Sequence, residues 1–221
     1  MTTHIGMLLF PGLTQLDLTG PYEVMHRIPD AKVHLVWKTK DPVAADSGLA
    51  IVPTVTFADC PPLDVVFVPG GPGQVPLMND REVLDFVRQH GQNARYVTSV
   101  CTGALVLGAA GLLEGYNATT HWAFTDLLAR VGARFAPGRV VVDRNRVTGG
   151  GVTAGIDFGL TLAAELAGAD VAKAIQLGIE YNPAPPFASG HPDVADPALV
   201  ATIRARFGDI TRRLGRDATG Q

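Results

Sequence analysis

The chain has 221 residues, of which 47% are hydrophobic and 18% charged, and this composition favours a packed globular core over disorder. Its formal net charge of −3 gives no basic footprint for nucleic acid, and no apolar run reaches transmembrane length. Two distant cysteines, Cys60 and Cys101, fit a reduced, cytoplasmic protein and argue against a Cys-x-x-Cys redox pair or a zinc knuckle.

The first half of the chain alternates apolar strands with helical stretches. It starts without the basic region of a secretory signal and enters a strand at residues 4–10, whose nearly continuous apolar run is typical of a buried parallel strand. A helix is expected next, with Pro21 near its first turn. The elements expected after it are a strand at 32–38, an excursion with short extended pieces at 41–57, a strand at 64–68 and a helix at 80–90.

Cys101 lies where a strand turns into a helix. Residues 96–100 form a β-branched run, and an Ala/Leu/Gly-rich helix follows the cysteine and ends at Gly111. Such a corner exposes its residue at the carboxyl edge of a sheet, as in a nucleophile elbow. The N-terminus of the following helix is expected to lower the pKa of the thiol and favour the thiolate. A buried, inert cysteine is the alternative interpretation.

The second half continues the alternation. The expected elements are a helix to about residue 131, strands at 139–143 and 146–148, a glycine loop at 149–151, helices from about 153 to 166 and 169 to 180, a Pro-rich break at 182–186 and a helix at 197–213. This order predicts an α/β fold, a flavodoxin-like three-layer α/β/α sandwich with a mainly parallel central sheet. Residues 1–190 are expected to form a single domain, and residues 191–221 a C-terminal arm with one helix.

Chemically useful residues follow the ends of the predicted central strands. Asp17, the pair Gly70 and Gly71, Cys101, and the loop at 149–153 each come after one strand. In parallel sheets the ligand site lies beyond the carboxyl ends of the strands. If the strands are neighbours, one pocket therefore holds a nucleophile, an acid/base and backbone donors for an oxyanion hole.

Asp17 is the candidate acid/base. Apolar residues flank it, which favours a partly buried carboxyl with a pKa suited to proton transfer. An acidic residue that merely complements a helix dipole is the alternative. Thr102 is a candidate site residue through its hydroxyl and N–H, whereas His121 and Asp157 are better explained by structural roles. Cys60 is interpreted as an inert structural thiol.

Several motifs resemble the ThiJ/PfpI superfamily, whose members share a class I glutamine-amidotransferase-like fold with a cysteine at a nucleophile elbow. The similarity covers about residues 4–190 and is weak in the C-terminal arm. The motifs are Val-Pro-Gly-Gly at 68–71, Ser-Val-Cys-Thr-Gly at 99–103, Thr-Thr-His-Trp at 119–122, and the glycine-rich run at 149–157. Members that hydrate isocyanides are further matched by the segments at 15–21, 57–65 and 180–187.

The resemblance implies a homodimeric enzyme that converts an isocyanide to an N-substituted formamide through a Cys101 thioimidate. On this basis Cys101 is the nucleophile, Asp17 the acid/base and Thr102 a supporting catalytic residue. The residues expected to contact the substrate or an oxyanion are Gly70, Gly71, Gly150 and Val152. In the family, the position of Val152 is often filled by isoleucine. The chemistry implied needs no metal and no organic cofactor.

Two departures from related branches limit the alternatives. The 149–157 segment supplies no histidine for an amidotransferase triad, and Thr102 stands where PfpI-type peptidases carry histidine. The remaining alternatives are a glyoxalase- or deglycase-like enzyme that uses the same thiol, and a cysteine-based redox or ligand sensor without turnover.

Overall fold

A seven-stranded sheet in the order β10-β11-β7-β6-β1-β2-β5 forms the centre of the computed structural model. The structure describes residues 2–217 and, for side chains, residues 2–208. All neighbouring strands of this sheet are parallel except the hairpin of β10 and β11. The strands are β1 (Thr3–Leu8), β2 (Ala31–Trp37), β5 (Val55–Thr56), β6 (Val65–Val68), β7 (Tyr96–Val100), β10 (Val140–Asp143) and β11 (Arg146–Gly149).

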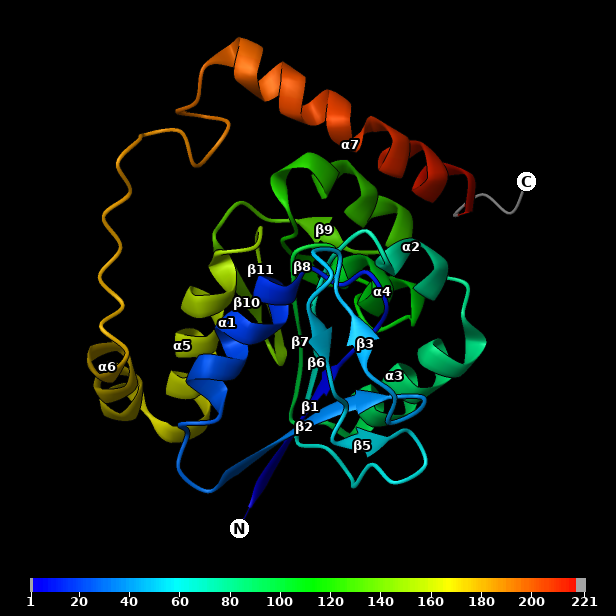
Figure 1. Ribbon diagram of the computed structural model, residues 1–221, viewed down its shortest axis with the longest axis vertical. Helices are drawn as coiled ribbons and strands as arrows, with labels where there is room; N and C mark the ends of the chain where they lie inside the picture. Colours follow the sequence, from blue (N-terminus) through cyan, green and yellow to red (C-terminus); the bar gives the residue numbers. More distant parts are fainter. Residues whose placement is uncertain (1, 218–221) are drawn as a thin grey trace.

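Helices cover both faces of the sheet, as Figure 1 shows. One face carries α1 (Gln15–Met25) and α5 (Ala154–Ala167), with α6 (Ala169–Gly178) beyond them. The other face carries α3 (Arg81–Asn93) and α4 (Gly103–Ala109). The three-layer α/β/α sandwich and its mainly parallel sheet are therefore confirmed.

Short elements account for most differences from the predicted order. The excursion after β2 contains β3 (Val43–Ala44) and β4 (Ala50–Ile51), as expected, while α2 (Gln74–Leu77) and the pair β8 (Asn117–Ala118) and β9 (Arg134–Phe135) were not predicted. Elements of two to four residues are too short to show periodicity. The helix expected before residue 131 is a 3₁₀ helix, η1 (Trp122–Val131).

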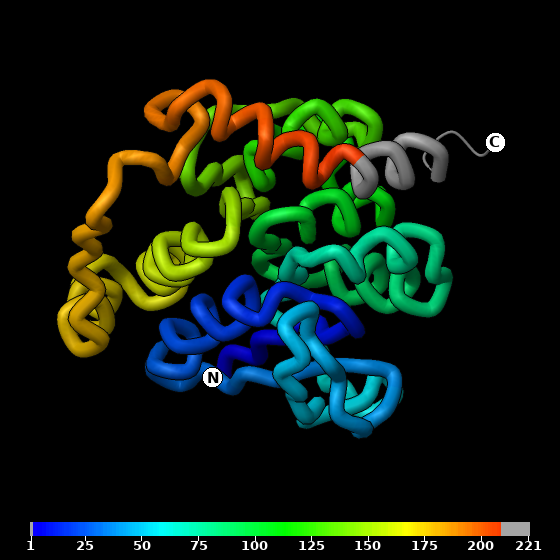
Figure 2. Tube along the Cα trace, turned by 45° about the horizontal axis from the view of Figure 1, so that its top comes forward, coloured from blue at the N-terminus to red at the C-terminus, as the bar shows by residue number. Residues whose placement is uncertain are grey.

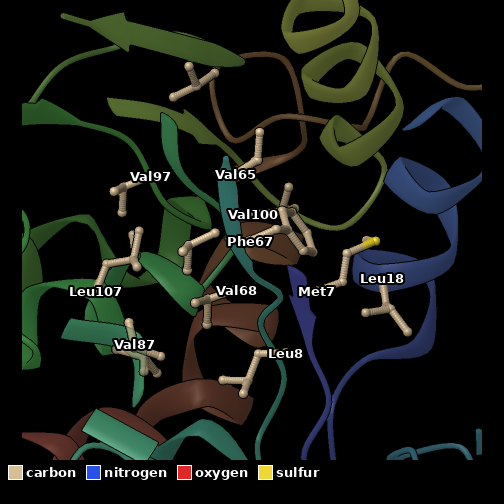
Figure 3. Packing of buried hydrophobic residues seen from close by; sticks show 14 of the residues in the cluster. Met7, Leu8, Leu18, Val65, Phe67, Val68, Val87, Val97, Val100 and Leu107 are labelled. Atoms are coloured by element: carbon tan, nitrogen blue, oxygen red, sulfur yellow. The ribbon is translucent and has the colours of Figure 1, made fainter. Parts of the chain in front are cut away.

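The core lies on both faces of the central strands. Residues of β6 and most of β1 and β7 are buried, which explains their continuous apolar runs. Figure 3 shows side chains from these strands packed with residues of the flanking helices, such as Leu18 and Leu107. Phe67 of β6 contacts Phe158 of α5 with ring centroids 5.4 Å apart, which fixes α5 against the sheet.

Pro21 corrects one prediction. It lies in the second turn of α1, not near the first, and therefore cannot donate the helical hydrogen bond to the Asp17 carbonyl. Gly155 of α5 packs directly against its ring, because a Cβ at residue 155 would come within 2.9 Å of Pro21 Cδ. Close packing of α1 on α5, on one face of the sheet, accommodates this proline.

The last helix, α7 (Pro197–Asp217), confirms the helix predicted in the C-terminal arm. Figures 1 and 2 show that the segment after α6 runs outside the body before α7 lies across η1. Phe207 of α7 contacts the rings of His121 and Phe124. The division of the chain at residue 190 stays a prediction. Within the described residues, no helix combines the length and apolar character needed to span a membrane.

Removal of the Phe67 ring tests this account of the core. Phe67 is fully buried, so Phe67→Ala is expected to lower the free energy of unfolding by about 3–5 kcal/mol, measured by urea denaturation. Leu49→Ala is the control, because Leu49 is 50% exposed and its truncation is expected to change stability by less than about 0.5 kcal/mol. Equal losses in the two variants would contradict the packing described.

Candidate active site

The strand order places the site at the junction of β1 and β6. The order of the parallel strands is that of flavodoxin-like sheets, in which the ligand crevice lies where the chain leaves adjacent strands in opposite directions. Asp17 lies in the first turn of α1 after β1, Gly70 follows β6, and Cys101 follows β7. The three predicted residues therefore reach the same edge of the sheet.

Cys101 has the left-handed backbone expected of a nucleophile elbow, with φ of 56°. For a residue other than glycine this conformation costs about 1–3 kcal/mol and needs support from its surroundings. The Cys101 N–H donates to the carbonyls of Gly149 (3.1 Å) and Gly150 (2.8 Å), and its carbonyl accepts from Thr120 Oγ1 at 2.7 Å. The elbow is thus held from both of its peptide groups.

Asp17 is fully buried beside the thiol, as its apolar neighbours in the sequence predicted. The Gly70 N–H donates to Oδ2 at 2.9 Å, and the carboxyl is within hydrogen-bonding reach of the Cys101 thiol. The other oxygen, Oδ1, makes no well-formed hydrogen bond to any described residue. One carboxyl oxygen is therefore anchored, and the other has no well-formed partner among the described residues.

Gly70 allows this close approach. A Cβ at residue 70 would lie 2.7 Å from Asp17 Oδ2, 2.8 Å from Cys101 Cβ and 2.6 Å from the Thr102 nitrogen. These atoms surround one point, so the acid, the nucleophile and Thr102 meet at a position where only glycine fits.

Asp17 and Cys101 lie in an environment that disfavours the charged form of both side chains. Burial raises the pKa of Asp17 to about 7, although the Cys101 thiol and the Gly70 N–H lower it in part. Burial also raises the pKa of the Cys101 thiol well above 9, and the neighbouring Asp17 charge raises it further. The prediction of a thiolate is therefore wrong for this structure, in which the thiol is neutral. The loss of solvation on burial raises its pKa more than the contacts with Thr102 lower it. Above pH 7 the pair holds a neutral thiol beside a carboxylate.

Thr102 contacts the sulfur, whereas its hydroxyl and N–H were predicted to contact a bound group or an oxyanion. Its N–H and its hydroxyl both lie within hydrogen-bonding reach of the thiol and favour negative charge there. The Gly71 N–H donates to Thr102 Oγ1 at 3.1 Å, which leaves the hydroxyl proton free to point elsewhere. Thr102 therefore lies between the glycine loop and the nucleophile.

The glycine N–H groups are used inside the protein. Gly70 donates to Asp17, Gly71 to Thr102, and Gly150 to the Arg139 carbonyl at 2.9 Å. These N–H groups were predicted to face the substrate, but in this structure they donate to other residues of the protein. The Val152 N–H makes no hydrogen bond to the described residues.

His121 and Cys60, which were predicted to have structural roles, lie in structural surroundings. His121 caps η1 by accepting the Ala123 N–H, and its ring lies against Gly151 and Phe207. Burial lowers the pKa of His121 to about 4, so the ring is neutral. Cys60 is partly buried, and burial raises the pKa of its thiol to about 11, which agrees with an unreactive thiol.

Thr120 is a site residue that the sequence analysis did not assign. It was noted only as part of the Thr-Thr-His-Trp motif, whereas its hydroxyl holds the Cys101 carbonyl. A threonine distant in sequence from the nucleophile gives no spacing from which this contact could be predicted.

The fold and the site define an α/β protein with a cysteine at a nucleophile elbow beside a buried carboxyl. A model of the DJ-1/PfpI family matches residues 3–165, and the chain belongs to this family.

Individual relatives agree with this assignment. The chain is 60% identical over 206 residues to an isonitrile hydratase of Pseudomonas putida, covering 93% of this chain and 90% of that protein. A crystal structure of a ThiJ/PfpI family protein from Pseudomonas syringae, 46% identical, covers 99% of this chain and 91% of its own, with a TM-score of 0.96. A Parkinson disease protein 7 homolog of Danio rerio is 28% identical over 77% of this chain and 93% of its own.

The buried carboxyl predicts an unusual dependence of stability on pH. Between pH 3.8 and about pH 7, Asp17 has lost its proton in the unfolded chain but keeps it in the folded protein. This group therefore lowers the free energy of unfolding as the pH rises through this range. At about 1.36 kcal/mol per pKa unit, the penalty reaches roughly 4 kcal/mol above pH 7. Asp17→Asn removes it, and the stability of this variant relative to the original protein is expected to increase from pH 4 to pH 8.

Urea denaturation of both proteins across this pH range measures the difference. Asp170→Asn is a suitable control, because the Asp170 side chain is 99% exposed and lies on α6, outside the site. A difference between Asp17→Asn and the original protein that stays constant with pH would contradict the raised pKa.

Proposed function

We propose that this protein is an isocyanide hydratase, which adds water to R–N≡C and releases the formamide R–NH–CHO. The 60% identity to the Pseudomonas putida isonitrile hydratase over almost the whole of both chains carries the proposal. The buried Cys101–Asp17 pair supplies a nucleophile and a proton relay for this reaction.

In the first step the thiol adds across the terminal carbon of the isocyanide. The Asp17 carboxylate takes the thiol proton as the sulfur–carbon bond forms, and it then delivers that proton to the same carbon. The product is the thioimidate R–N=CH–S bound to Cys101. A pKa of about 7 suits Asp17 to accept and release a proton near neutral pH.

In the second step water replaces the sulfur. Asp17 accepts a proton from water as the water oxygen bonds to the thioimidate carbon, and it passes this proton to the substrate nitrogen. Collapse of the tetrahedral species breaks the carbon–sulfur bond and releases the formamide, and the proton of its hydroxyl group moves through Asp17 to the departing sulfur. The unpartnered Oδ1 of Asp17 supports its role as the oxygen that exchanges these protons.

The other predicted site residues have supporting roles in this proposal. Thr102 stabilises developing negative charge on the sulfur through its N–H and hydroxyl. Gly70 and Gly71 orient Asp17 and Thr102, and Gly150 holds the Cys101 backbone. Val152, whose N–H has no acceptor within the described chain, is the remaining candidate for a direct contact with substrate.

We also propose a cytoplasmic homodimer. The resemblance in sequence to dimeric members of the family and the two free cysteines support it. Large apolar side chains exposed on α6 and on the segment after it, Leu177, Phe187 and Val194, agree with a surface that a partner covers.

Turnover of a simple alkyl or aryl isocyanide tests the function. Formamide formation, followed by NMR, is expected in the original protein and to fall at least about 10³-fold in Cys101→Ala and at least about 10²-fold in Asp17→Asn. Cys60→Ala is the matched control, and it is expected to keep full activity because Cys60 lies outside the site.

Methylglyoxal in place of the isocyanide separates the glyoxalase alternative. Turnover of methylglyoxal alone would replace the proposal with that alternative. A protein that turns over neither compound would favour the sensor, and full isocyanide turnover by Cys101→Ala would rule out the mechanism.

The pKa of Asp17 predicts that kcat/KM decreases as the pH falls below about 7. Only the carboxylate can take the thiol proton, so kcat/KM is expected to rise with pH and level off above about 7. Initial rates from pH 5 to 8.5, corrected for uncatalysed hydrolysis, measure it. A flat profile across this range would show that Asp17 does not accept the proton.

A further inference from the structure

Arg139 contacts both ends of the loop beneath the nucleophile. It immediately precedes β10, and its carbonyl accepts the Gly150 N–H at 2.9 Å. Its guanidinium donates from Nη2 to Thr153 Oγ1 at 3.1 Å. Gly150 and Thr153 bracket the turn between β11 and α5, so one residue spans this turn with its backbone and its side chain.

This loop supports the backbone of the nucleophile. The Cys101 N–H donates to the carbonyls of Gly149 and Gly150, and these bonds hold Cys101 at its positive φ. Gly150 therefore accepts from Cys101 on one side and donates to Arg139 on the other. The backbones of Arg139 and Cys101 are thus linked through a single residue.

Two further side chains fix the guanidinium. Arg139 Nε donates to Asp157 Oδ2 at 2.5 Å, and the Tyr181 hydroxyl donates to the same oxygen at 3.0 Å. Asp157 lies in the first turn of α5, and Tyr181 follows α6. The contacts thus join three separate parts of the chain around one side chain.

We propose that Arg139 is a positioning residue for the Cys101 reaction, held in place by Asp157 and Tyr181. This inference rests on the proposed function for the reaction itself, and its effect on the thiol can be measured without any substrate turnover. Arg139 does not touch the reacting atoms and acts through the 150–153 turn.

The burial of Cys101 predicts how loss of the Arg139 contacts would change the ionisation of its thiol. Cys101 is 6% exposed, and the burial of its thiol is the main reason that the thiol resists ionisation. A loosened turn admits water to the sulfur, so the thiol is expected to ionise at lower pH and react faster with a small alkylating agent. Turnover is expected to fall, because the sulfur no longer keeps its position beside Asp17.

Arg139→Met removes the guanidinium and keeps an unbranched side chain. Arg144→Met is a matched control in the same β-hairpin: the Arg144 side chain is 58% exposed against 52% for Arg139, and it also contacts a carboxylate and a second oxygen. Arg144 lies at the turn between β10 and β11, at the far end from Gly150. Arg139→Lys keeps the charge for Asp157 and is expected to give intermediate values.

Two readouts on the full-length protein test the proposal, at a temperature where circular dichroism shows each variant folded. For Arg139→Met, kcat is expected to fall at least tenfold with KM within threefold. Alkylation of Cys101 by iodoacetamide, resolved from Cys60 by peptide mass spectrometry, is expected to show a midpoint at least 0.5 pH unit lower. Arg144→Met is expected to match the original protein within twofold in kcat and within 0.2 pH unit in the alkylation midpoint.

An Arg139→Met alkylation profile that coincides with those of the original protein and Arg144→Met would overturn the proposal. A shifted profile supports positioning of the thiol even if the original protein hydrates no isocyanide, a result that would refute only the proposed function.

Discussion

The burial of the Asp17 carboxyl against the Cys101 thiol is the constraint on which the site depends. Water is excluded from both groups, so neither holds a charge easily, and the pKa of Asp17 rises to about 7. The same burial makes the thiol a weak acid, which requires a neighbouring base to take its proton. In the proposed mechanism, the thiol therefore reacts only with Asp17 beside it as the base.

Placing this pair together requires a strained backbone at Cys101 and close packing at Gly70. Cys101 adopts a left-handed backbone held by Gly149, Gly150 and Thr120. Gly70 lacks a side chain at the point where the acid, the thiol and Thr102 meet. Asp17, Gly70, Cys101 and Gly149 lie at or after the ends of four strands, β1, β6, β7 and β11, and the parallel pairing of these strands brings the residues to one edge of the sheet.

The sequence was sufficient for the fold class and for the residues that gather at that edge. Continuous apolar runs identified the buried strands, and each strand end pointed to the residues after it, including Asp17 and Cys101. It was not sufficient for the ionisation of the thiol, because a helix N-terminus favours thiolate while burial opposes it, and only the packed structure shows which effect is larger. The use of the Gly70 and Gly71 N–H groups and the contact of Thr120 also depend on three-dimensional packing that no local spacing encodes.

Mass spectrometry of the protein during turnover tests the central claim most directly. The reaction with an isocyanide is stopped in acid after milliseconds to seconds, and the peptide that contains Cys101 is analysed. The mechanism predicts a transient increase in the mass of this peptide equal to the mass of the whole isocyanide, which decays as formamide is released. Formamide production with the Cys101 peptide unmodified at every time would contradict covalent catalysis by the buried pair.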